Sequence, residues 1–213
     1  MSSPNTSTGS EIDALGLVTA AGESTRMGGF PKPLLCFDGQ RFVERITDQY
    51  ELAGVSDILV VLGHEAAAVR AATDLEEATV VVNDTYQDGM LSSVKLGVEH
   101  AIASDRSAMF LWPVDFPCVT AETVRSLWSA YDEHDTDIVL PQVEGEGGHP
   151  ALFCHTTFES LLNAPQDEGA RAVVYDPDTT VTAVDVNDPR ILVDIDRPSE
   201  YWEAVKRYEI GGR

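Results

Sequence analysis

Residues 17–35 read LVTAAGESTRMGGFPKPLL, and they take the chain from an apolar run into a glycine-rich loop. The apolar run predicts a buried first strand over residues 15–20. The small residues Ala20, Ala21 and Gly22 then leave room for a ligand to lie against the backbone. Exposed backbone N–H groups in such a loop can form a concave site for an anion.

Two cations follow in the same loop. Arg26 supplies a planar charged fork that suits phosphate oxygens, and Lys32 supplies a point charge held between two prolines. The spacing fits neither a P-loop, because no Lys-Ser or Lys-Thr pair follows Gly28, nor the G-x-G-x-x-G dinucleotide motif. One alternative is a glycine-rich turn with two surface cations. The ordered set of Gly22, Arg26, Gly28 and Lys32 directly after a strand favours a triphosphate site.

Apolar runs alternate with segments of helical spacing, which predicts a mostly parallel sheet between two helical layers, a Rossmann-like three-layer αβα fold. We expect strands over 15–20, 58–62, 79–82, 108–114 and 138–142, and helices over 41–53, 65–73, 91–103 and 121–133. After residue 141 we expect a short strand, two short helices, strands over 181–186 and 192–194, and a closing helix over 198–207. A single domain over 14–213 would follow a Ser/Thr-rich, disordered tail over 1–13.

Acidic residues follow two of the later apolar segments. Ligands of open α/β sheets bind beyond the carboxyl ends of the strands, and Asp115 stands at such an end. A carboxylate there can hold Mg²⁺ or simply cap the next turn. Asp194 and Asp196 flank Ile195, so in a strand both would face the same way and one could complete the metal site. The alternative for Asp196 is a residue that only starts the closing helix.

Six blocks of the chain, in order, resemble the signature of nucleotidyltransferases of the molybdenum-cofactor type. The first, over 20–35, resembles L-A-A-G-x-x-x-R-M-G…P-K-x-L, with Thr19 in place of Leu. Trp112-Pro113-Val114-Asp115 departs from the usual G-D-x-P, and Arg197 replaces the Thr of D-I-D-T-P. The blocks cover residues 20–35, 89–94, 113–117, 148–150, 168–171 and 194–198.

The resemblance implies roles for individual residues. Asp115 and Asp196 would be the ligands of Mg²⁺, with Asp194 as the alternative to Asp196. Gly89 and Ser93 would face the nucleobase, although a helix cap is a compatible role for Ser93. The acceptor side would include His149 and Arg171, but a lone histidine is more often structural.

The implied reaction transfers a nucleoside monophosphate from CTP or GTP to a phosphorylated acceptor of the molybdopterin kind and releases pyrophosphate. A molybdoenzyme partner is also implied. One alternative is a related transferase for a sugar phosphate, phosphoalcohol or phospholactate. Another is a non-catalytic nucleotide-binding or chaperone-like protein, which would not need to keep Arg26, Lys32, Asp115 and Asp196 together.

Composition limits the partners. The 213 residues carry 36 acidic and 14 basic side chains, a net charge of −22, and only three lysines. Such a surface repels nucleic acid and anionic membranes, and it is compatible with a salt-rich cytoplasm or with a plain acidic surface. No signal peptide or membrane-length apolar run is present in the sequence, so we expect a cytoplasmic protein. The three cysteines lack metal spacing and are expected to be buried thiols.

Overall fold

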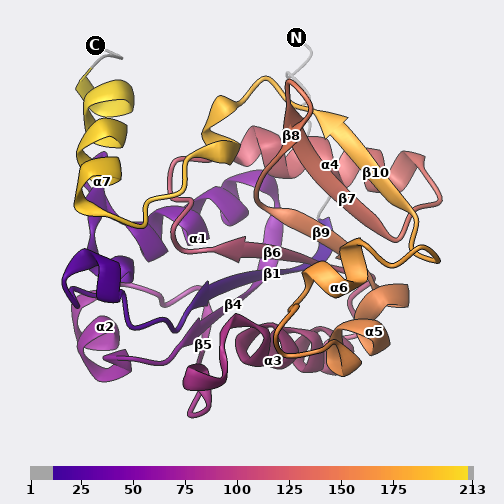
Figure 1. Cartoon of the computed structure of the whole chain (residues 1–213), viewed down its shortest axis with the longest axis horizontal. Coiled ribbons are helices and arrows are strands. Elements are labelled where there is room, and N and C mark those ends of the chain that lie inside the picture. Colours follow the sequence, from indigo (N-terminus) through magenta and orange to yellow (C-terminus); the bar gives the residue numbers. More distant parts are fainter. Residues whose placement is uncertain (1–11, 211–213) are drawn as a thin grey trace, which may run out of the picture.

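The computed structural model describes residues 12–210. Residues 1–11, and with them most of the predicted tail, lie outside the described part. Within it, an eight-stranded sheet has the order β10-β7-β9-β6-β1-β4-β5, with β8 paired to β7 (Figure 1). Its strands are β1 (Ile12–Ala20), β4 (Val55–Leu62), β5 (Thr79–Val82), β6 (Ala108–Pro113), β7 (Ile138–Val143), β8 (Glu146–Gly147), β9 (Ala151–Cys154) and β10 (Val181–Asp185). Strands β2 (Cys36–Phe37) and β3 (Gln40–Arg41) form a separate hairpin.

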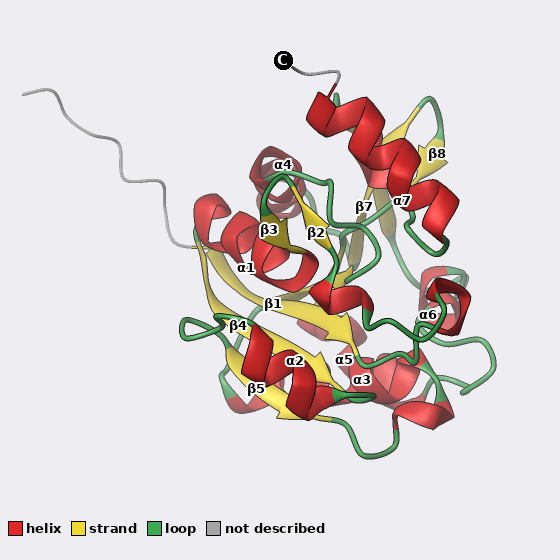
Figure 2. Cartoon of the chain, turned by 90° about the vertical axis from the view of Figure 1, so that its left-hand side faces the viewer, coloured by secondary structure: helices red, strands yellow, loops and turns green. Residues whose placement is uncertain are grey.

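The sheet is parallel except where β9 and β8 join it. Strand β9 runs antiparallel between β6 and β7, and β8 is antiparallel to β7. The helices are α1 (Phe42–Ala53), α2 (Ala66–Ala72), α3 (Met90–Ala103), α4 (Ala121–Glu133), α5 (Phe158–Asn163), α6 (Arg171–Val174) and α7 (Pro198–Ala204), which continues as a π-helical segment, Val205–Ile210. Helices α1, α4 and α7 lie on one side of the sheet and α3 and α5 on the other (Figure 2). The predicted three-layer fold is confirmed.

The middle strand β1 separates two hydrophobic clusters. Its residues Ala14 and Val18 belong to the cluster under α1 and α4, whereas Leu15 and Leu17 belong to the cluster under α3 and α5. This alternation follows from the two-residue repeat of a strand. Because both faces are covered, β1 reads as the continuous apolar run seen in the sequence.

Two glycines let the flanking helices approach β1 closely. A Cβ on Gly16 would lie 2.9 Å from the ring of Tyr50, which is fully buried on α1. On the opposite face, a Cβ on Gly97 of α3 would lie 2.4 Å from Leu17. A side chain at either position would clash with a buried side chain of the facing element, which would have to move. The strand that carries the glycine-rich loop is therefore clamped from both sides.

Three expectations were wrong in detail. Strand β1 begins at Ile12 rather than at residue 15, so residues 12 and 13 are not part of a tail. The predicted strand over 192–194 is absent: a 3-10 turn, Pro189–Leu192, is followed by residues without regular secondary structure. Cys118 and Cys154 are buried thiols as expected, but Cys36 is exposed. No helix of residues 12–210 is long and apolar enough to cross a bilayer.

Candidate active site

A pocket of about 440 Å³ opens at the carboxyl ends of β1 and β6. These strands are neighbours in the sheet, and both end there. The pocket receives residues from four separate segments of the chain, which are the loop after β1, the start of α3, the end of β6 and the segment before α7. Its lining is Thr19, Ala20, Ala21, Gly22, Ser24, Thr25, Arg26, Lys32, Pro33, Tyr86, Gly89, Met90, Ser93, Pro113, Val114, Asp115 and Asp196.

The loop after β1 is folded tightly enough to bring both cations to the pocket. Its backbone turns through the left-handed region at Ser24 and at Gly28, where φ is 52° and 71°. Gly28 does not line the pocket; it ends the 3-10 turn that carries Arg26. The Lys32 N–H donates to Ser24 Oγ at 3.1 Å, which closes the loop. Lys32 is buried to 8% exposure between its two prolines.

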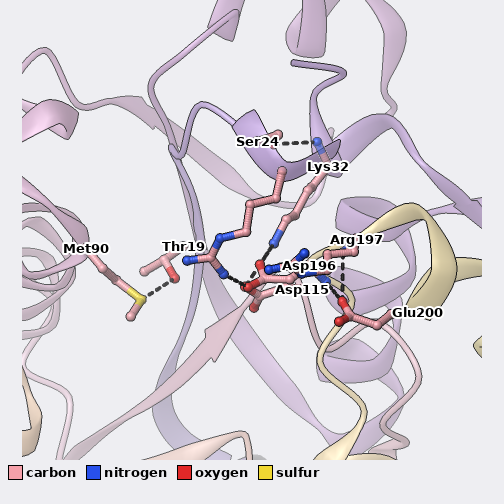
Figure 3. Close-up of polar contacts among 9 residues, drawn as sticks. Thr19, Ser24, Lys32, Met90, Asp115, Asp196, Arg197 and Glu200 are labelled. Atoms are coloured by element: carbon pink, nitrogen blue, oxygen red, sulfur yellow. Dashed lines mark hydrogen bonds and ion pairs between the residues drawn. The ribbon is translucent and has the colours of Figure 1, made fainter. Parts of the chain in front are cut away.

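The two cations pair with two carboxylates (Figure 3). Lys32 Nζ lies 3.3 Å from Asp115 Oδ2 and is also hydrogen-bonded to Asp196 Oδ1. Arg26 Nη1 donates to the other oxygen, Asp196 Oδ2. The Lys32 side chain is 11% exposed and the Arg26 side chain 63%, so the lysine pairs are held away from water and the arginine pair is not.

Asp115, Asp194 and Asp196 form a carboxylate cluster, with one oxygen from each lying within 4.8 Å of the others. Ile195 is fully buried, and its N–H donates to the Asp115 carbonyl oxygen at 2.8 Å. With Ile195 held there, the carboxylates of the residues before and after it lie close to that of Asp115. Asp115 Oδ1 is buried and has no hydrogen-bond partner.

The pKa values of Asp194 and Asp196, the two carboxyls on either side of Ile195, are shifted in opposite directions. Burial would raise the pKa of Asp196, but hydrogen bonds and charge from Lys32, with the charge of Arg26, lower that pKa below its ordinary value. Asp194 is exposed and lacks those partners. Partial loss of hydration, with repulsion from Asp115 and Asp196, raises the pKa of Asp194 to about 6. The cluster therefore carries more negative charge than its two cations neutralise.

Asp196 does not serve as a helix cap. Glu200 reaches back from the first turn of α7 and accepts hydrogen bonds from the N–H groups of Asp196 and Arg197, at 2.8 and 2.7 Å. This frees the Asp196 side chain to face Lys32 and Arg26. Arg197, not Asp196, is the N-cap residue of α7, and sequence reasoning missed the bonds that Glu200 makes to this segment.

The opposite wall of the pocket is the entry of α3. Gly89 precedes the helix with a φ of 101°, a backbone conformation that favours glycine. Ser93 is buried, and its hydroxyl accepts a hydrogen bond from Asn83 Nδ2 at 3.0 Å. The same amide binds Ser92 Oγ at 2.8 Å. Asn83, missed from the sequence, is a buried polar residue that directly follows β5 and orders this wall.

Two predicted acceptor-side residues do not line the pocket. The ring of His149 packs on Phe116 with centroids 4.8 Å apart, and its buried Nδ1 has no partner. Burial lowers the pKa of His149, while the charge of Asp115 acts in the opposite direction. His149 therefore lies outside the lining of the cavity, packed on Phe116 and close enough to Asp115 to be affected by its charge. Arg171 is exposed at the start of α6.

Comparison with known proteins decides the family. A family model described as the MobA-like NTP transferase domain matches residues 16–181. The chain belongs to the MobA-like NTP transferase family. The match confirms the resemblance seen in the sequence blocks and the assignment of this chain as an enzyme of the nucleotidyltransferase type. Asp194 and Asp196 lie beyond the matched segment, and the fold brings their carboxylates close to Asp115.

Relatives within the family differ in named activity. The molybdenum cofactor cytidylyltransferase of Escherichia coli (strain K12) is 28% identical over 93% of this chain and 98% of its own. The nicotine blue oxidoreductase of Paenarthrobacter nicotinovorans is 29% identical over 89% of this chain and 95% of its own. Rv0371c of Mycobacterium tuberculosis H37Rv has a similar structure, with a TM-score of 0.77 and 28% identity over 92% of this chain and 99% of its own. That protein has also been solved as a complex with manganese, to which this chain compares with a TM-score of 0.72.

Proposed function

We propose that this enzyme transfers a nucleoside monophosphate from an NTP to a phosphorylated small-molecule acceptor and releases pyrophosphate. The observation that carries the proposal is the meeting of Arg26, Lys32, Asp115 and Asp196 in one pocket at the end of the central strands. Hydride transfer from a reduced nicotinamide cofactor, the alternative activity, does not require cations beside a cluster of carboxylates. A triphosphate bound with a divalent cation requires cationic side chains for its phosphates and carboxylates for the metal.

The residues present fit a divalent cation. Three carboxylates converge, and the buried Asp115 Oδ1 lacks any partner. Asp115 and Asp196 would hold Mg²⁺, with Asp194 beside them. When bound, the ion would neutralise charge on the phosphates.

The protein's own groups then position the reactants. Arg26 and Lys32 bind phosphate oxygens, and the small residues Ala20, Ala21 and Gly22 let the nucleotide lie on the backbone. An oxygen of the acceptor phosphate attacks the α-phosphorus. The bond from that phosphorus to the bridging oxygen breaks, and pyrophosphate leaves with the electron pair. A phosphate monoester has a second pKa of about 6, so it is already a competent nucleophile near neutral pH and needs no strong base.

CTP and a molybdopterin-type acceptor are the first substrates to test, because a relative that matches nearly the whole chain is named a molybdenum cofactor cytidylyltransferase. GTP is the second nucleotide, and sugar phosphates, phosphoalcohols and phospholactate are the other acceptors. The experiment measures pyrophosphate release with each NTP across these acceptors, with Asp115→Asn as the inactive control. Oxidation of a reduced nicotinamide cofactor without pyrophosphate release under any condition would overturn the proposal.

A further inference from the structure

Arg26 and Lys32, the cations proposed to bind phosphate, pair with Asp115 and Asp196, the carboxylates proposed to bind the metal. We propose that Lys32 competes with the divalent cation for Asp115 and Asp196, and that the cation releases Lys32 to the triphosphate as it binds. This inference rests on the proposed function of the pocket. It makes metal and nucleotide binding mutually dependent through an exchange of ion-pair partners.

The geometry gives Lys32 the place of a counter-ion. Its single ammonium group contacts one oxygen from each of two carboxylates, at 3.3 Å from Asp115 Oδ2 and by a hydrogen bond to Asp196 Oδ1. Both carboxylates belong to the cluster whose oxygens lie within 4.8 Å of one another. A cation bound by these oxygens would lie beside the ammonium group, and like charges that close repel each other.

Burial determines which cation competes more strongly. The side chains of Lys32, Asp115 and Asp196 are 11%, 26% and 24% exposed, so their attraction is only partly screened by water. Arg26 is 63% exposed, and exposed ion pairs contribute little. Lys32 should therefore be the main competitor, and Arg26 a minor one.

The cluster also has capacity left for a second cation. Asp115 uses Oδ2 for Lys32, while Oδ1 is buried without a partner. Asp194 adds a third, exposed carboxylate whose oxygen lies within 4.8 Å of oxygens of the other two. Lys32 thus holds the carboxylates together but satisfies them incompletely, so a divalent ion can displace it.

Release of Lys32 requires only a side-chain movement. Its backbone is fixed by the flanking prolines and by the bond to Ser24 Oγ, and its side chain already lines the pocket. An ammonium group freed from the carboxylates would therefore stay inside the cavity, where the triphosphate binds. By thermodynamic reciprocity, nucleotide that captures Lys32 must tighten metal binding by the same factor.

The test measures binding of Mn²⁺ alone, from the electron paramagnetic resonance signal of the free ion, with no turnover involved. Lys32→Met should bind Mn²⁺ about tenfold more tightly than the natural protein, because a charge-assisted competitor is gone. Arg26→Gln should give a smaller gain. Lys206→Met removes the same charge at an exposed position outside the pocket and should leave affinity unchanged.

The second readout is the affinity for α,β-methylene-CTP with and without Mn²⁺. In the natural protein Mn²⁺ should strengthen binding of this analogue, and in Lys32→Met that strengthening should shrink. Equal or weaker Mn²⁺ binding by folded Lys32→Met would overturn the inference and make Lys32 an organiser of the metal site. If Lys32→Met melts below the working temperature, Lys32→Gln decides: it must tighten Mn²⁺ binding relative to Lys206→Met. Mn²⁺ binding that Asp115→Asn leaves intact would instead refute the metal site of the proposed function.

Discussion

The N–H of Ile195 donates to the carbonyl oxygen of Asp115 at 2.8 Å, and this bond joins two segments that lie far apart in the sequence. Ile195 itself is fully buried. The bond and the buried side chain together bring the carboxylates on either side of Ile195 up to Asp115. The site is therefore built by core packing as much as by its polar groups.

Ile195→Ala should harm both stability and the site. Removing a fully buried isoleucine side chain costs about 2–5 kcal/mol of unfolding free energy, and Ile195→Val about 1 kcal/mol. Because the same side chain orients Asp196, Mn²⁺ affinity should fall in Ile195→Ala and remain normal in Ile195→Val. Denaturant melts and Mn²⁺ titrations measure the two effects. Normal Mn²⁺ affinity in Ile195→Ala would show that Ile195 does not orient the cluster.

Asp115→Asn and Asp196→Asn should each lower turnover by about 100-fold or more, because either change weakens the same bound cation. The double variant should be little worse than either single one. Asp194→Asn should be milder, since Asp194 is exposed and lacks the ion pairs of Asp196. Pyrophosphate release at saturating Mg²⁺ measures this, with thermal melts as the folding control. If Asp194→Asn were inactive and Asp196→Asn active, Asp194 rather than Asp196 would be the second ligand of the cation.

Arg26→Ala should weaken binding of a nucleoside triphosphate by about tenfold and that of the monophosphate much less, if the guanidinium binds the terminal phosphates. Calorimetric titration with CTP and CMP measures the difference. Arg207→Ala is the matched control, because Arg207 is exposed near the end of the described chain and does not line the pocket. Equal losses of affinity for CTP and CMP would show that Arg26 does not bind the terminal phosphates.

Asp137 should make stability depend on acidity. Hydrogen bonds from the Thr156 hydroxyl and from the N–H and hydroxyl of Thr180 lower its pKa below the ordinary value. A carboxyl with a lowered folded-state pKa stabilises above its unfolded pKa of about 4, and this contribution is lost as pH falls through the folded-state value. Asp137→Asn should therefore melt at a lower temperature than the natural protein at pH 7, and this difference in melting temperature should shrink toward pH 3. A difference that does not change with pH would contradict this.

The acidic surface should make the fold depend on salt. A groove between α1 and the segment before β5 is lined by Glu44, Asp48, Glu51, Asp74, Glu76 and Glu77. Loss of hydration, with repulsion from Asp48 and Glu77, raises the pKa of Glu51. Molar KCl should raise the melting temperature by screening such repulsion. Glu51→Gln should raise it at low salt and not at molar salt, whereas a flat salt response would indicate an ordinary acidic surface.

The local features of the site were predictable from the sequence, because they follow from short-range patterns. The cationic loop appeared as small residues, Arg26 and a proline-flanked Lys32 after an apolar run. Asp115 followed from the rule that ligands bind at strand ends. The prediction for Asp194 and Asp196 placed them together for a reason that was wrong. No strand forms there; the buried Ile195 and its hydrogen bond to Asp115 instead hold both carboxylates near Asp115.

Features that depend on contacts between distant segments were not predictable. Strand β9 enters the sheet antiparallel between β6 and β7, a pairing that no local pattern specifies. Asn83 and Glu200 looked like ordinary polar residues until the fold brought Ser93 and Asp196 to them. The pairing of Lys32 with carboxylates was equally hidden, since its sequence context indicated only a phosphate ligand.

The bond between Ile195 and Asp115 also bears on how the protein matures during synthesis. A ribosome releases the cationic loop and the first carboxylate long before it adds residues 194–196. Until those residues arrive, Lys32 has one of its two acidic partners, and the core lacks the isoleucine that fixes the other. The carboxylate cluster can therefore be completed only after every described strand of the sheet has already been synthesised.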